Sequence, residues 1–327
     1  MIRLLTGILL SAVAGVAAFG QSQQALAPQP QASSPQPPTW LQDKAEVLRV
    51  IDLDEAEVRK GEASLADRMP LAATYSELGV LYVDAGMGLK AEDAFRRAIA
   101  LLKHGPQDQL ANELEQLAVL QSGMGEYREA KKNEIQALAI RQTLADPVDI
   151  ALSESAIAGI YDDERKFAKA RDYAEKAYDV LADRSDVGVQ DRIEVWHTLG
   201  FALTGLHDCD RGIGVLKDAL EMARSSPGWG DASLGYSEYM LGFGYWRCRD
   251  RDNADVWLQR GTTELKAEFG RSHATYVGAM KQYALFLRQN GQFQEAASAE
   301  AVVHQAESVV DASTLAGRTE RSNTPSP

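Results

Sequence analysis

The sequence has little positive charge, few aromatic residues and only two cysteines among its 327 residues. Two cysteines allow at most one intrachain disulfide and exclude a disulfide-rich small domain. The formal net charge of −13 argues against a nucleic-acid binder, because phosphate recognition requires a concentrated basic face. Proline is scarce between residues 40 and 312, where alanine is abundant and β-branched runs are few. This composition indicates helices.

The first twenty residues have the pattern of an export signal. Arg3 precedes an uncharged apolar stretch over residues 4–19, and the small residues Ala18 and Gly20 provide a cleavage site. The stretch is shorter than the roughly 20 residues that a membrane-spanning helix needs. We therefore predict a signal peptide at residues 1–20 whose removal leaves no stable membrane span. The alternative is an uncleaved anchor, and in the first case the protein is periplasmic or secreted.

Polar segments flank the part of the chain that can fold. Residues 21–39 are mostly Gln, Pro, Ser and Ala without charge, and residues 313–327 are also polar. Neither segment can bury a core, so we predict a disordered linker and a disordered tail. Residues 40–70 are rich in Leu, Ala and charged side chains, which favours one or two helices that cap the repeats described next.

Residues 71–312 contain an internal repeat. Its six copies begin at Ala72, Ala111, Ala151, Ile193, Gly235 and Val277, at steps of 39 to 42 residues. At repeat positions 8, 20 and 27, every residue except one is Gly or Ala, whereas composition alone would give roughly four of eighteen. The residues at these positions are Gly79, Ala118, Ala158, Gly200, Gly242, Ala284; Ala91, Ala130, Ala170, Gly212, Ala254, Ala296; and Ala98, Ala137, Ala177, Ala219, Gly261, Val303.

The spacing within each copy predicts two antiparallel helices. Large apolar residues at positions 4, 7 and 11, such as Tyr75, Leu78 and Tyr82, lie on one face of a helix. Helices approach closely only where side chains are small. We therefore expect positions 8 and 20 to face each other within a pair, and position 27 to pack against the next pair. Glycines such as Gly86 and Gly125 mark the turns between the helices.

This pattern resembles the tetratricopeptide repeat (TPR), in which W-x2-L-G-x2-Y is followed by A-x3-F. The residues that carry the resemblance are Tyr75, Leu78, Gly79, Tyr82, Ala91, Phe95 and Ala98 in the first copy, and Trp196, Leu199 and Gly200 in the fourth. The period of about 42 residues is similar to that of kinesin-light-chain repeats. The resemblance implies an all-α superhelical solenoid of helix pairs in an exported bacterial protein, and it is unspecific for function.

No motif for catalysis or metal binding emerges from the sequence. The segment from Gly86 to Ala91 is a loose dinucleotide-binding pattern, but it falls between two helices rather than after a strand. Asp250 to Asp255 lacks the glycine and the glutamate of a calcium loop. His207 and Cys209 have no second pair at zinc spacing. We therefore predict a non-enzymatic protein without cofactor or metal.

The two cysteines belong to neighbouring repeats. Cys209 is at repeat position 17, and Cys248 is at position 14 of the next copy, so both lie at turns between first and second helices. Equivalent turns of stacked repeats lie roughly 10 Å apart, whereas a disulfide needs Cα atoms within about 7 Å. A disulfide and a pair of free thiols are both left open by the sequence.

Binding is expected on the concave face that first helices line in such arrays. The TPR pattern places repeat positions 2, 5, 9, 12 and 13 there. Repeats one to three supply small or acidic residues, and repeats four to six supply aromatic and basic ones, which we predict to form an exposed partner-binding patch. The alternative is that the N-terminal segment or tighter superhelical packing covers the aromatic rings. The predicted patch consists of His197, Phe201, Tyr236, Tyr239, Phe243, Trp246, Arg247, Lys281, Leu285 and Arg288.

The predicted function is an extracytoplasmic scaffold that binds a protein or peptide segment in this groove. The aromatic and basic residues indicate a partner that is apolar with some negative charge. One alternative is a small ligand or glycan bound by the rings of repeats four to six. Another is a helical-solenoid enzyme that uses acids of the first half of the groove, such as Glu115 or Asp162.

Overall fold

The computed structural model describes residues 50, 52–53, 55–61, 68–226, 231–271 and 273–306, and every regular element in these ranges is a helix. The predicted signal peptide at 1–20, the linker at 21–39 and the tail at 313–327 lie outside these residues. In the described part of the chain, no helix combines the length and the apolar character that crossing a membrane requires.

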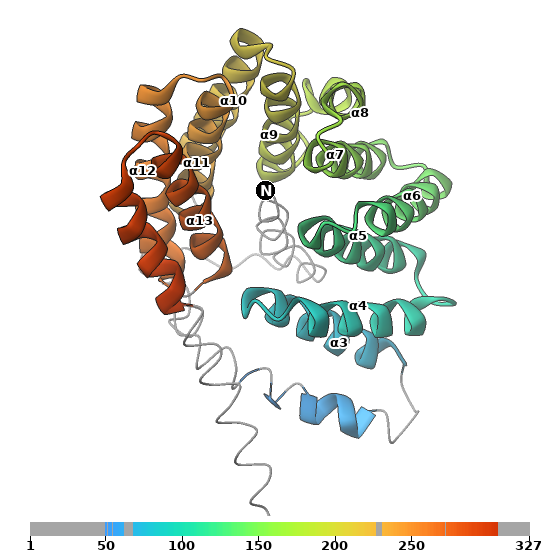
Figure 1. The fold of residues 1–327 in the computed structure, drawn as a ribbon. Coiled ribbons are helices and arrows are strands. Elements are labelled where there is room, and N and C mark those ends of the chain that lie inside the picture. The colour runs from blue at the N-terminus through green and yellow to red at the C-terminus, as the bar shows by residue number, and fades with distance from the viewer. Residues whose placement is uncertain are drawn as a thin grey trace, which may run out of the picture.

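Successive helices form antiparallel pairs along an arc (Figure 1). The pairs are α3 (Arg68–Asp84) with α4 (Gly88–Leu102), α5 (Gln107–Met124) with α6 (Tyr127–Leu144), α7 (Pro147–Asp163) with α8 (Phe167–Leu181), α9 (Val189–Gly205) with α10 (Cys209–Arg224), α11 (Asp231–Arg247) with α12 (Arg251–Phe269), and α13 (Ala274–Gln289) with helical residues 293–306. Each first helix begins three or four residues before the repeat start assigned from sequence. The predicted all-α architecture of helix pairs is therefore confirmed.

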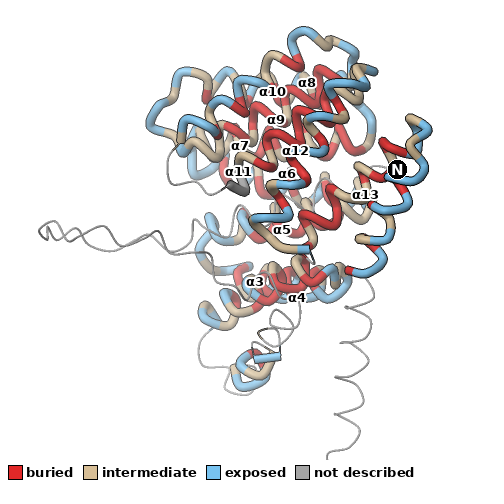
Figure 2. Tube along the Cα trace, turned by 90° about the vertical axis from the view of Figure 1, so that its left-hand side faces the viewer, coloured by how far each residue is buried: buried red, intermediate tan, exposed pale blue. Residues whose placement is uncertain are grey.

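The first helices of neighbouring pairs contact one another, as α5 does with α7, α7 with α9, and α9 with α11. We call this row the inner helices. Buried residues lie where helices face each other, and exposed residues lie on the outer sides of the pairs (Figure 2). The sixth pair also reaches the first, because α13 contacts α3 and His273 Nε2 lies 3.8 Å from Asp84 Oδ1.

Small residues allow the two helices of a pair to approach closely. A Cβ atom on Gly212 would lie 3.0 Å from the carbonyl oxygen of Gly200, so positions 8 and 20 face each other in this pair as predicted. At position 27 of the fifth repeat the prediction is wrong. A Cβ atom on Gly261 would lie 2.4 Å from the backbone nitrogen of Tyr239, which belongs to the first helix of the same pair. The glycine there permits backbone contact within the pair rather than between pairs.

The six turns within the pairs share the same backbone conformation and the same closing hydrogen bond. The residue at repeat position 15 has a positive φ of 62° to 83°, and the next N–H donates to the carbonyl of position 11, five residues earlier. This 6→1 hydrogen bond is the Schellman motif that ends many helices. The position-15 residues are Gly86, Gly125, Arg165, His207, Arg249 and Gly291. Three of them are therefore non-glycine residues in a conformation that costs about 1–2 kcal/mol.

Part of the predicted N-terminal cap is described. Residues 55–61 are helical, and Val58 is buried in a cluster that includes Tyr75 and Leu78 of α3. Glu55 accepts a hydrogen bond from the Tyr82 hydroxyl. These contacts attach the short helix to the first pair, which is where a cap of the repeat array belongs.

Candidate functional site on the inner helices

The aromatic side chains of the predicted patch lie mainly in the seams between inner helices. The rings of Phe201 in α9 and Phe243 in α11 have centroids 5.6 Å apart. Trp246 of α11 makes an edge contact with Phe286 of α13, also at 5.6 Å. Inner helices pack side by side, so positions 9 and 12 of one repeat are covered by the next inner helix. The predicted exposure is therefore wrong for His197, Phe201, Tyr239 and Phe243, which are all buried.

Arg247 is the centre of a buried contact between helices. Its guanidinium donates to both carboxylate oxygens of Asp162 in α7, at 2.9 Å and 2.5 Å, and to the carbonyl oxygen of Phe201 at 2.8 Å. The same group lies over the rings of Phe167, Phe201 and Phe243, 5.1–5.3 Å from their centroids. This residue was predicted to meet a partner, but the structure uses it to join α7 to α11.

A second buried arginine joins α5, α6 and α7. Arg141, on the second helix α6, donates to Ser153 at 2.7 Å and to Asn112 at 2.9 Å, and it pairs with Glu115. Sequence reasoning missed it, because only first helices were expected to reach the concave side. Glu115 and Asp162, the acids considered for catalysis, are thus each paired with a guanidinium.

Five residues of α5, α9 and α11 form what we call the central polar cluster: Glu115, Glu194, His197, Tyr236 and Tyr239. The rings of His197 and Tyr236 meet edge to face with centroids 5.5 Å apart. Burial, together with the negative charges of Glu115 and Asp191, raises the pKa of Glu194 to about 8. Burial lowers the pKa of His197 to about 3, so its imidazole is neutral.

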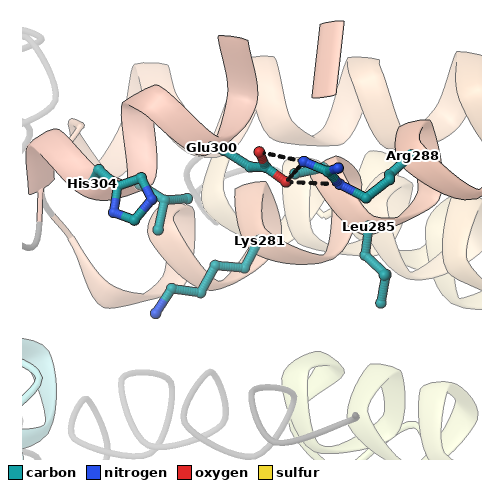
Figure 3. Close-up of a pocket in the computed structure, with 7 residues that line it drawn as sticks. Lys281, Leu285, Arg288, Glu300 and His304 are labelled. Carbon is teal, nitrogen blue, oxygen red and sulfur yellow. Dashed lines mark hydrogen bonds and ion pairs between the residues drawn. The ribbon is translucent and has the colours of Figure 1, made fainter. Parts of the chain in front are cut away.

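A pocket of about 250 Å³, the end pocket, lies between α13 and the helix that follows it (Figure 3). Lys281, Leu285 and Arg288 line it from α13, at the repeat positions that Tyr239, Phe243 and Trp246 occupy in α11. Among the described residues α3 meets only the start of α13, near His273, and the positions further along α13 hold charged and aliphatic side chains instead of rings. Its remaining lining residues are Ala284, Glu300, Val303 and His304.

Cys209 and Cys248 form a disulfide, with Cα atoms 5.8 Å apart. The three-position offset between them brings the turns of the fourth and fifth pairs within bonding distance, which decides between the two possibilities left open by the sequence. Neither thiol is therefore available as a metal ligand. No group of three or more His, Cys, Asp or Glu in the described ranges is arranged to hold a metal ion.

No protein-family model and no curated protein matches the sequence. Among solved structures, the apo form of RapI is similar with a TM-score of 0.61 at 12% identity, over 82% of this chain and 93% of that chain. Aspartyl phosphate phosphatase F from Bacillus subtilis is similar with a TM-score of 0.59 at 14% identity, over 81% of this chain and 70% of that chain. TPR-like repeats of a putative kinesin light chain from Podosopora anserina give a TM-score of 0.46 at 16% identity, over 62% of this chain and 98% of that chain. This chain has a TPR-like fold.

The TPR-like fold confirms the solenoid that the repeat pattern predicted. At these sequence identities the likeness concerns the fold alone. The inner helices of this TPR-like array carry the central polar cluster and one wall of the end pocket. These two features are therefore the candidate functional sites on this face.

Proposed function

We propose that this chain is a scaffold that binds a protein or peptide segment on the surface of its inner helices. The end pocket is the observation that carries this proposal. At the positions where α11 has buried rings, α13 presents Lys281, Leu285 and Arg288 around a pocket. Arrays of helical repeats use the surface lined by their inner helices to bind extended partners.

The lining of the end pocket defines the partner segment. Ala284, Leu285 and Val303 provide an apolar floor, which suits an aliphatic or aromatic side chain. Lys281 and Arg288 add positive charge to the rim. The Arg288 guanidinium also donates to the two carboxylate oxygens of Glu300, at 2.6 Å and 2.7 Å (Figure 3). The proposed partner therefore inserts an apolar side chain beside an acidic one.

Two further parts of the proposal concern export and catalysis. The signal-like residues 1–20 support action outside the cytoplasm, in the periplasm or the medium. The ion pairs of Glu115 and Asp162 support binding without turnover, because a guanidinium group already occupies each carboxylate. One structural neighbour is named as a phosphatase, and that name describes the neighbour alone. Glycan stacking is disfavoured, because Tyr239 and Phe243 are buried.

Site-specific photo-crosslinking tests this function. A photoreactive phenylalanine analogue replaces Leu285 in the end pocket or Ile135 on the outer helix α6, whose side chain is 54% exposed. The full chain is expressed in cells that export it, and crosslinked products are identified by mass spectrometry. We expect a defined protein partner from residue 285 and none from residue 135. The same products from both positions, or products from residue 135 alone, would contradict the proposal.

A further inference from the structure

Three polar atoms of the central polar cluster have no hydrogen-bond partner among the described residues. They are His197 Nε2 and the hydroxyl oxygens of Tyr236 and Tyr239. His197 is 4% exposed, and Tyr239 is fully buried. Buried polar groups are nearly always hydrogen-bonded, because an unsatisfied group loses its hydration without replacement. Three such atoms on adjacent inner helices therefore indicate a partner that the protein itself does not supply.

The surroundings of these atoms contain more carboxyl groups than cations. Arg141 is the cation that interacts with the carboxylates of Glu115, Glu134 and Asp149. Glu194 interacts with Glu115 and Asp191, and the Tyr236 hydroxyl with Glu194 and Asp163. The acids come from α5, α6, α7 and α9, whereas α11 adds two tyrosines and Arg247, whose charge acts on Asp163. Two guanidinium groups are thus shared among a larger number of carboxyl groups, and a further cation would be stabilised there.

We propose that the central polar cluster binds a primary ammonium group, carried either by a lysine side chain of a partner protein or by a free amine. An ammonium group has three N–H donors and no acceptor. The neutral imidazole of His197, the hydroxyl of Tyr236 or Tyr239, and the carboxylate of Glu194 provide acceptors for them. A sugar hydroxyl would satisfy the same atoms but would bring no positive charge to pair with the carboxyl groups. The inference rests on the proposed function only in taking the inner helices as the binding surface.

Binding is coupled to the ionisation of Glu194. Because the pKa of this carboxyl is raised to about 8, it is mostly protonated at neutral pH and must lose its proton to pair with the cation. The ammonium group itself stays charged over this range. Affinity therefore rises as the pH increases from about 6 to 9, and binding near pH 7 releases a proton. Calorimetric heats measured in two buffers of different ionisation enthalpy detect this release.

Isothermal titration calorimetry of the full chain tests the inference. The probes are cadaverine, pentane-1,5-diol of the same length without charge, and a short Gly/Ser peptide with one central lysine or acetyl-lysine. We expect binding of cadaverine, of the lysine peptide or of both, and no binding of the diol or the acetylated peptide. Binding of the peptide alone assigns the cation to a protein side chain, and binding of cadaverine alone assigns it to a free amine. Binding of neither, or equal binding of the diol, overturns the proposal.

Four variants separate binding from folding. Glu194→Gln should raise the dissociation constant at least about thirtyfold, as expected when one partner of a buried charge pair is lost. Its matched control, Glu129→Gln on the exposed side of α6, should leave binding unchanged. Tyr239→Phe removes an unpartnered hydroxyl, so it should weaken amine binding without lowering the melting temperature. Leu285→Asp should abolish partner capture at the end pocket but keep amine binding. Equal weakening by Glu194→Gln and Glu129→Gln would contradict the inference.

Discussion

Replacing Arg247 with Met tests whether one buried ion pair stabilises the middle of the array. The side chains of Arg247 and Asp162 are 11% and 6% exposed. Without the guanidinium, Asp162 remains buried beside Asp163, whose pKa is already raised to about 7, chiefly by burial. Loss of one partner from a buried pair costs about 3–5 kcal/mol. We expect the free energy of unfolding in urea, followed by far-UV circular dichroism, to fall by that amount.

Arg288→Met is the matched control for this experiment. Arg288 pairs with Glu300 at the surface, where the two side chains are 52% and 39% exposed, so its loss should cost at most about 1 kcal/mol. The double variant Arg247→Met/Asp162→Asn should be less destabilised than the two single variants added together, because asparagine needs no counter-charge. The cost of Arg247→Met should also grow as the pH rises through about 7, because Arg247 lowers the pKa of Asp163 and its loss raises that pKa further. Equal losses in Arg247→Met and Arg288→Met would show that the buried pair stabilises the protein no more than the surface pair.

Three further predictions concern the disulfide, one turn and pH. Replacing Cys209 and Cys248 with Ser removes a cross-link between residues 39 positions apart, and should lower the unfolding free energy by about 4 kcal/mol. A reducing agent should have the same effect on the parent protein and none on the variant. Gly86→Ala places a side chain at a φ of 72° and should cost about 1–2 kcal/mol in the same urea assay. The melting temperature should fall between about pH 6.5 and 8.5, because the raised pKa values of Glu113 and Glu194, about 7 and 8, make the folded state hold protons that the unfolded state has lost. Burial lowers the pKa values of the two buried histidines, so their titration affects the stability only below about pH 6.5. A constant or rising melting temperature would therefore contradict the assignment of this pH dependence to the two glutamates.

The helix pairs could be predicted because their requirements are local. Gly200 and Gly212 occur where two helices must touch, and the repeat places them at fixed spacing. The turn geometry was only partly predictable. Arg165, His207 and Arg249 adopt the same left-handed conformation as the glycines at repeat position 15, although arginine does not signal a positive φ. Only the alignment of all six copies reveals this shared position.

The exposure of the groove residues could not be predicted from one repeat. Position 9 borders both the concave face and the neighbouring inner helix, and the tilt between repeats decides which of them Phe201 and Phe243 meet. The pair of Arg247 with Asp162 links residues 85 positions apart, so its existence depends on the superhelix. One signal was present in the sequence. Position 5 changes from Tyr239 to Lys281 between the fifth and sixth repeats, which marks the change from a covered to an open surface.

If the inner helices bind the partner and the outer helices only support them, the partner should protect the inner helices from exchange. Hydrogen–deuterium exchange of the full chain, with and without the partner captured at residue 285, measures this protection. We expect protection in α9, α11 and α13. Protection confined to the outer helices α6, α8 and α10 would contradict this expectation.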